Sequence, residues 1–215
     1  MKNKKIHWIF FICAILIILI IAIYIFLNFF QKNTAKNFKM GNNKSSQEIV
    51  NQILNISSYE LVAEVEVNSN KNSSIYKIKQ CYIDENNNSQ EILEPSNIKG
   101  VTIIREKGTL TLKNTNLNLV KVFEDYDVIT NNALDLSVFL KEYKGENKNQ
   151  VQSTQIDEDS NYIILTVILD NSNTYIKEKN LYINKTSGLI ERMEMLSANK
   201  TERVNIIYNE VEILN

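Results

Sequence analysis

Tyr59-Glu60-Leu61-Val62-Ala63-Glu64-Val65-Glu66-Val67 alternates apolar residues with residues that are mostly acidic. A period of two is typical of a β-strand that buries one face and exposes the other. The polar run 68–72 predicts a turn, and alternation resumes over 74–83, where Tyr76, Ile78, Gln80 and Tyr82 fall on one side. This part of the chain is therefore predicted to form a long antiparallel hairpin.

Strand patterns continue along most of the remaining chain. The further predicted strands are 90–93, 100–106, 109–113, 118–123, 154–156, 162–169, 174–183, 189–197 and 203–213. Thr186-Ser187-Gly188 predicts a hairpin turn with its glycine in the left-handed region. Together these segments predict one long antiparallel sheet.

Two helices are predicted beside the sheet. Ser45-Ser46-Gln47-Glu48 is a capping-box pattern, and the apolar residues after it recur at helical spacing, which predicts a short helix over 46–56. A second helix is predicted over 133–143, ending before Gly145. Its apolar face includes Leu134, Leu136, Phe139 and Leu140. Such a face needs a surface to cover, and the concave side of a curved sheet supplies one, so the predicted class is α+β.

The N-terminal segment is predicted to be a membrane anchor. The twenty residues Trp8–Leu27 carry no charge, and at 1.5 Å per residue a helix of this length spans the hydrocarbon core of a bilayer, about 30 Å. The residues expected in the bilayer include Trp8, Phe11, Leu16, Ile20, Tyr24 and Leu27. No small-x-small cleavage site follows them, so residues 1–30 are interpreted as an uncleaved signal anchor.

The lysines flanking this segment bear on its orientation. Lys2, Lys4 and Lys5 favour a cytoplasmic N-terminus, whereas four lysines over 32–44 on the other flank oppose it. Because a short lysine-rich tail is typical of a signal anchor, we expect a single-pass protein with its body outside the cytoplasm. Residues 31–44 are polar and predict a stalk, and 45–215 form the extracytoplasmic domain.

Charge and histidine content exclude several functions for this domain. The whole chain has a net charge of −1, but residues 1–44 hold seven lysines and no acid, which leaves 17 basic and 25 acidic residues in 45–215. An acidic surface argues against nucleic-acid binding. The only histidine is His7, so the domain has no Ser-His-Asp or Cys-His machinery and no histidine-ligated metal.

The remaining candidates for chemistry are acids and one thiol. Glu124-Asp125-x-Asp127 and Asp157-Glu158-Asp159 are the densest acidic clusters. A carboxylate pair can hydrolyse glycosides, and acidic loops can bind calcium, but neither cluster has the spacing of a calcium loop. We interpret both as solvated loops and Cys81 as an unreactive strand residue. No catalytic residue, metal or cofactor is expected.

The most distinctive motif surrounds the only proline of the chain. It reads Glu91-Ile92-Leu93-Glu94-Pro95-Ser96-Asn97-Ile98-Lys99-Gly100-Val101-Thr102-Ile103-Ile104. Pro95 is expected to end one strand, and Gly100 to begin the next with an unusual backbone angle. The residues singled out as a structural motif are Glu94, Pro95, Asn97 and Gly100. Locally, this pattern predicts a well-defined turn between two strands.

Four segments, taken in order, resemble the LolA-like superfamily of lipoprotein carriers. They are the opening helix and hairpin, this proline motif, the segment 180–190 and the final Tyr208-Asn209-Glu210-Val211-Glu212-Ile213. Within this superfamily the chain is most similar to the clostridial GerS group of spore germination proteins. The resemblance implies a curved antiparallel half-barrel sheet. It also implies a non-catalytic role in cortex modification, as partner of a CwlD-like cortex amidase that supplies the zinc and the catalytic residues. GerS proteins are lipoproteins, whereas here the predicted transmembrane helix replaces the lipid.

Four functional hypotheses follow. The first is a membrane-anchored binding protein of the spore envelope that acts on a wall amidase in germination. The second is a lipid or lipoprotein carrier that holds an acyl chain in a cavity between the sheet and the helix 133–143. The third is an envelope sensor that needs a membrane partner, and the fourth is an enzyme that uses the acidic clusters.

Overall fold

A computed structural model describes residues 44–69, 71–124, 134–146, 151–170 and 175–214 of the 215-residue chain. The described elements are α2 (Ser46–Leu54), β1 (Tyr59–Asn68), β2 (Ser73–Asp84), β3 (Asn87–Glu94), β4 (Val101–Glu106), β5 (Thr109–Asn114), β6 (Leu119–Phe123), α3 (Leu136–Lys144), β7 (Val151–Glu158), β8 (Tyr162–Leu169), β9 (Glu178–Asn184), β10 (Ile190–Leu196) and β11 (Glu202–Ile213). The architecture is thus mostly β, with two described helices.

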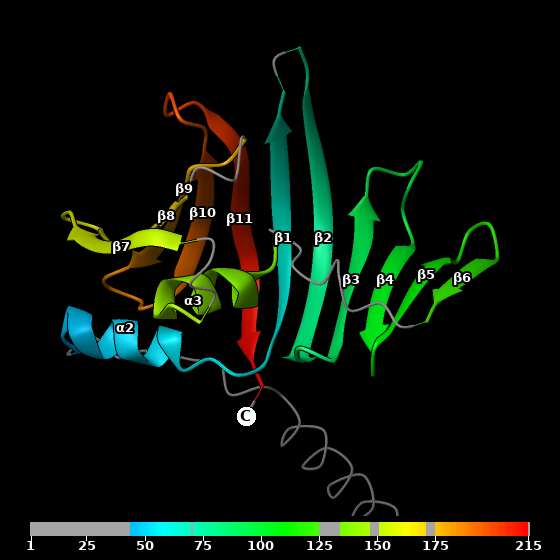
Figure 1. The fold of residues 1–215 in the computed structure, drawn as a ribbon, viewed down its shortest axis with the longest axis horizontal. Helices are drawn as coiled ribbons and strands as arrows, with labels where there is room; N and C mark the ends of the chain where they lie inside the picture. The colour runs from blue at the N-terminus through cyan, green and yellow to red at the C-terminus, as the bar shows by residue number, and fades with distance from the viewer. Residues whose placement is uncertain (1–43, 70, 125–133, 147–150, 171–174, 215) are drawn as a thin grey trace, which may run out of the picture. The chain divides into compact units, whose positions relative to one another are not determined.

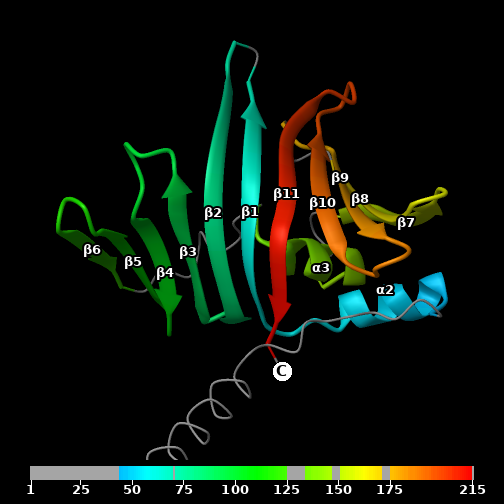
Figure 2. The same ribbon diagram turned by 180° about the vertical axis from the view of Figure 1, so that it is seen from behind.

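The strands form one 11-stranded sheet in the order β6-β5-β4-β3-β2-β1-β11-β10-β9-β8-β7. Every neighbouring pair is antiparallel. Figures 1 and 2 show the consequence: the first and last strands lie side by side near the middle of the sheet, and the chain runs outward from them on both sides. The two edges of the sheet are therefore β6 and β7.

The central pair of strands shows which face of the sheet is buried. Tyr59, Leu61, Ala63 and Val65 of β1 are almost completely buried, whereas the alternate positions, such as Glu64, are not. The alternation predicted for this stretch is confirmed. The pairing of β1 with β11 shifts register between Val62 and Ala63, as it does at a β-bulge.

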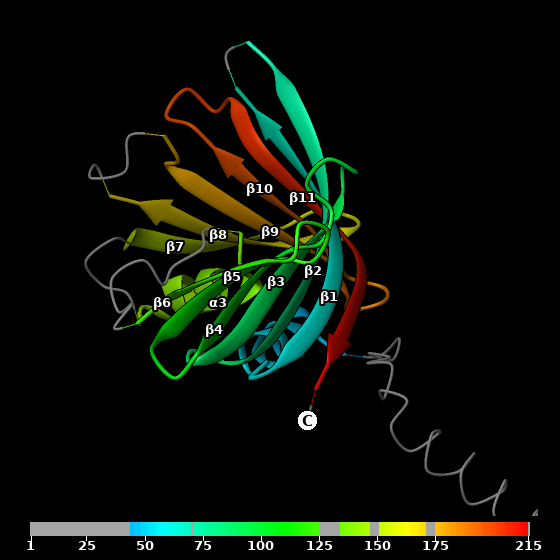
Figure 3. The ribbon, with the colours of Figure 1, turned by 90° about the vertical axis from the view of Figure 1, so that its right-hand side faces the viewer.

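Both helices pack on this buried face. Apolar residues of α2 and α3 belong to one continuous buried cluster with residues of β1, β2 and β8–β11. Figure 3 shows the sheet curving around the two helices as a half-barrel. The predicted helix on the concave side is confirmed, and its Leu136, Phe139 and Leu140 are at most 3% exposed. Leu134, in the turn before α3, packs against the same cluster, and Ala133 lies outside the described residues.

The start of α2 is fixed by the predicted capping box. The backbone N–H of Glu48 donates to Ser45 Oγ at 3.4 Å, and the backbone N–H of Ser45 donates to Glu48 Oε2 at 2.8 Å. The helix ends at Leu54, two residues before the predicted end. Glu48 accepts hydrogen bonds from the backbone and side chain of Ser45, and these lower the pKa of its carboxyl group.

Some strand boundaries differ from the predictions. The strand predicted over 174–183 begins at Glu178 in the structure; Tyr175, three residues earlier, is 79% exposed, and Thr174 lies outside the described residues. β7 is longer than the predicted 154–156 because its pairing with β8 runs from Val151 to Glu158. Nearly all of β7 is exposed, so it has no apolar alternation that could mark its full length.

Among the described residues, no helix has the length and apolar character needed to cross a bilayer. The predicted anchor 1–30, including Trp8, Phe11, Leu16, Ile20, Tyr24 and Leu27, lies outside the described residues, and so does the predicted stalk apart from Lys44.

Candidate functional site

A buried ion pair fixes α3 to the sheet. Lys179 Nζ of β9 lies 2.9 Å and 2.7 Å from the two carboxylate oxygens of Glu142 in α3, and each side chain is only 4% exposed. Because the two groups are withdrawn from water, each charge depends on the other for compensation. This contact holds the C-terminal half of α3 at one position on the concave face.

A polar cluster holds the other end of α3. The hydroxyl oxygen of Tyr59 accepts a hydrogen bond from the backbone N–H of Ser137 at 3.2 Å. Burial is the main cause that raises the pKa of Tyr59, and the nearby charge of Asp135 adds to it. The ring of Tyr59 stacks on Tyr82 with 5.3 Å between centroids. The first turn of α3 is therefore positioned by an aromatic pair in the centre of the sheet.

Strands β2–β4 reach the same end of α3 through Gln80 and Arg105. Gln80 is 2% exposed, and its side-chain N–H group donates to the carbonyl oxygen of Leu134 at 3.2 Å. Arg105 donates to Asn88 Oδ1 at 2.8 Å and lies 3.8 Å from the carboxylate of Asp135. These residues were not predicted as a cluster, although Gln80 shares the alternation of Ile78 and Tyr82. A glutamine on the apolar side of a strand was the available signal.

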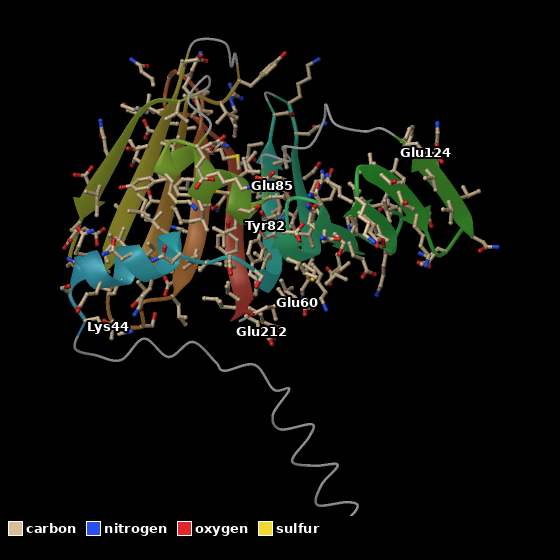
Figure 4. The ribbon with its side chains drawn as sticks, turned by 60° about the horizontal axis from the view of Figure 1, so that its bottom comes forward. Lys44, Glu60, Tyr82, Glu85, Glu124 and Glu212 are labelled. Atoms are coloured by element: carbon tan, nitrogen blue, oxygen red, sulfur yellow. The ribbon has the colours of Figure 1, made fainter. Side chains whose placement is uncertain are left out.

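The side of α3 that faces β2 is tied by charge. Lys141 forms an ion pair with Glu85, in the turn after β2, and its Nζ lies 5.8 Å from the centre of the Tyr82 ring. Figure 4 labels Tyr82 and Glu85 beside the helix. With the buried pair and the polar cluster, α3 has contacts at both ends and along its length.

The proline motif forms the connection between β3 and β4. Glu94 ends β3, Pro95 and Asn97 lie in the turn, and Gly100 precedes β4 with φ +81°. The N–H of Gly100 donates to the carbonyl oxygen of Ile92 at 2.8 Å, which closes the turn. The unusual backbone angle predicted for Gly100 is confirmed, and the motif is a structural element in this chain.

The same turn supports the connection between β5 and β6. The carbonyl oxygen of Gly100 accepts hydrogen bonds from the backbone N–H and the side-chain hydroxyl of Thr115, both at 3.3 Å. The side-chain amide of Asn116 donates to the carbonyl oxygen of Lys99 at 2.6 Å. The motif therefore positions two hairpin turns at once, which its sequence did not reveal.

Replacing Gly100 by Ala is expected to lower the free energy of unfolding by about 1–3 kcal/mol. An added Cβ would lie 2.4 Å from Thr115 Oγ1, on a backbone that already disfavours side chains. Urea denaturation followed by circular dichroism measures the change. Gly108→Ala is the matched control, since Gly108 has φ +79° but nothing within 4 Å. Equal losses in the two variants would contradict a role for the contact with Thr115.

The described acids that were considered for catalysis make local surface contacts. Asp159 accepts backbone hydrogen bonds from Tyr162 at 2.6 Å and Asn161 at 2.7 Å, which lower the pKa of its carboxyl group. Glu158 forms an ion pair with Lys185 at 2.8 Å. In the described part of the chain, no group of three or more histidine, cysteine or acidic residues is placed to hold a metal ion. Asp125 and Asp127 lie outside that part.

The free thiol of Cys81 is half-buried on β2. Burial is the main cause that raises the pKa of this thiol, and the charge of Glu60 adds to it. A raised pKa keeps the thiol protonated near neutral pH, which is the opposite of what a nucleophilic cysteine needs.

Residues 8–214 match the family described as Sporulation protein YdcC-like. The chain belongs to the YdcC-like sporulation family. The match begins inside the predicted anchor and ends at the last described residue, so it includes both helices and all the strands described above. No curated protein matches the sequence.

Several solved structures are similar to this YdcC-like chain. A chain of the complex between the CwlD amidase and the GerS lipoprotein of Clostridioides difficile has 24% identity and a TM-score of 0.47, over 80% of this chain and 98% of that one. An uncharacterised protein of Thermus thermophilus has 12% identity and a TM-score of 0.48, over 80% and 89%. A LolA superfamily protein of Nitrosomonas europaea has 13% and 0.39, over 80% and 95%. At TM-scores below 0.5, none of these likenesses bears on what the YdcC-like chain binds.

Proposed function

We propose that this YdcC-like protein is a membrane-anchored, non-catalytic binding protein that acts outside the cytoplasm during sporulation, as partner of a cell-wall amidase. The family match over residues 8–214 is the observation that carries the proposal, because it connects the predicted anchor and the folded domain to sporulation. Residues 45–215 contain no histidine, so the proposed partner supplies the zinc ligands and the acid–base chemistry. The amidase itself is suggested by the sequence resemblance to the GerS group.

The packing of the sheet and its helices supports a binding role. Its concave face is filled where α2 and α3 pack, and α3 is fixed by contacts at both of its ends. A protein partner would meet a surface that needs little reorganisation, which reduces the entropic cost of association.

A carrier function is the second candidate, and one observation favours it. Ile92, Ile103 and Leu112 point to the concave side of β3–β5 and are only partly buried, and Leu119 of β6 is 60% exposed. Native mass spectrometry of the purified protein would detect a retained lipid. If the spectrum, recorded after gentle removal of detergent, shows the mass of the protein without a bound lipid, this candidate is contradicted.

Deleting the gene is expected to remove the amidase-dependent lactam from the spore cortex, and the full-length protein in detergent is expected to co-purify with the sporulation amidase of the same organism. Muropeptide analysis and size-exclusion chromatography are the measurements. Cortex with normal lactam content, together with separate elution of the two proteins, would refute the proposed function.

A further inference from the structure

We propose that the edge strand β6 binds an extended, acidic segment of the protein partner by strand addition. The name β6 edge is used below for Leu119–Phe123 together with Leu117 of the preceding turn. This inference rests on the proposed function, because the occupant is taken to be a segment of the proposed amidase partner. It adds the place on the sheet where the partner binds and the chemistry of the segment that binds.

Exposed apolar side chains are concentrated at the β6 edge. Leu117 is 65% exposed, Leu119 and Val120 are each 60% exposed, and Val122 is 52% exposed. The opposite edge is different: β7 is also exposed, but its residues from Gln152 to Glu158 are polar or acidic apart from Ile156. Natural proteins protect sheet edges with charges and bulges, and β7 has both, including a register shift between Val151 and Ser153.

The apolar residues occupy both faces of β6. Leu119 lies opposite Asn114 on the concave side, whereas Val120 and Val122 lie opposite Lys113 and Thr111 on the convex side. Among the described residues, β6 pairs only with β5. An edge strand that is apolar on both sides, and whose residues 119–122 pair with one described strand alone, is suited to receive another strand.

Charge indicates what kind of strand fits. Residues 99–123 hold five basic residues and one acid, while the rest of 45–215 holds 12 basic and 24 acidic residues. Four of the five basic residues are exposed: Lys99, Lys107, Lys113 and Lys121. The β6 edge therefore lies in a basic stretch, residues 99–123, of an otherwise acidic domain. Electrostatic complementarity favours an acidic occupant, and it speeds the encounter.

Two other occupants are less compatible with these observations. A second copy bound through a two-fold axis would bring two identical basic surfaces together, which is unfavourable. An anionic membrane would complement the lysines, but hydrocarbon offers no partners for the backbone groups of an edge strand. A strand from another protein satisfies these backbone groups and covers the apolar side chains together.

The β6 edge is also held in a fixed position. The turn before it is tied to the proline motif by the hydrogen bonds from Thr115 to Gly100 and from Asn116 to Lys99. Lys121 lies 4.8 Å from the centre of the Phe123 ring, which orders one face of the strand. A strand that is already extended and supported loses little conformational entropy when it binds.

The test measures the affinity of the full-length protein in detergent for the purified sporulation amidase of the same organism. Val120→Asp with Val122→Asp, and separately Lys113→Glu with Lys121→Glu, are expected to weaken binding at least about tenfold. Added salt should weaken binding of the parent more than binding of the lysine variant. The matched control is Ser153→Asp with Gln155→Asp on β7, which is expected to bind as the parent does. Circular dichroism verifies that each variant is folded.

Amide hydrogen exchange of the parent protein gives a second readout that requires no substitution. Strand addition is expected to slow exchange of backbone amides in residues 119–123 when the amidase binds. One outcome would overturn the inference and leave the proposed function standing. In that outcome the parent binds the amidase, the β6 variants bind it as tightly as the parent, and exchange in residues 119–123 does not slow. Loss of binding to phosphatidylglycerol vesicles in the same variants, without loss of amidase binding, would assign the edge to the membrane and overturn the inference. A parent that does not bind the amidase would overturn both.

Discussion

Replacing Lys179 by Met is expected to lower the free energy of unfolding by about 3–5 kcal/mol. Lys179 and Glu142 are each 4% exposed and contact each other at 2.7 Å, so the substitution leaves the Glu142 carboxylate buried without its counter-charge. The cost arises mainly from this uncompensated charge. Urea denaturation of a fragment of residues 44–215 measures the loss.

Two further variants make the result specific to burial. Glu142→Leu combined with Lys179→Met removes both charges and is expected to recover most of the lost stability, because an apolar pair of similar size can replace a buried ion pair. Lys185→Met removes a lysine that pairs with Glu158 at 2.8 Å on the surface, and it is expected to leave the urea midpoint nearly unchanged. A surface variant as damaging as Lys179→Met would show that burial is not the cause.

Replacing Phe139 by Ala is expected to lower the free energy of unfolding by about 3–5 kcal/mol. Phe139 is completely buried in the cluster that joins α3 to the sheet, and its ring stacks on Tyr143 with 6.3 Å between centroids. The substitution leaves a cavity that the surrounding sheet cannot fill. Urea denaturation followed by far-UV circular dichroism is the measurement. Tryptophan fluorescence does not serve, since the fragment 44–215 contains no tryptophan.

The comparison variant is Leu117→Ala, which removes an apolar side chain that is 65% exposed. Its expected effect on stability is within about 0.5 kcal/mol. This pair of variants also separates the two candidate functions. A loss below about 1 kcal/mol for Phe139→Ala would mean that α3 is loosely attached to the sheet. That behaviour would suit a carrier whose helix opens over a ligand, and it would contradict the packed helix described above.

Much of the local structure could be predicted because its signals lie close together in the sequence. The alternation from Tyr59 to Val67 extends over one strand, and the capping box of Ser45 and Glu48 over one helical turn. The unusual backbone angle of Gly100 in the proline motif is a property of one residue in one turn. The strand predicted over 174–183 was wrong at its start, because β9 begins at Glu178. The strand predicted over 154–156 was too short, because β7 runs from Val151 to Glu158 without an apolar pattern that marks its ends.

By itself, the sequence determined the hairpin, the two helices, the exclusion of histidine chemistry from residues 45–215, and the resemblance to a curved antiparallel sheet. Only the tertiary structure decided which strands become neighbours and which become edges. Pairing of β1 with β11 joins residues about 150 positions apart, as Tyr59 and Ile213 do. Once that pair forms, β6 becomes an edge, and its apolar residues, which along the chain look like those of any half-buried strand, remain in solvent. Lys179 and Glu142 likewise look like surface charges in the sequence. Their burial follows from the packing of α3 on β9, which the period of either segment alone does not specify.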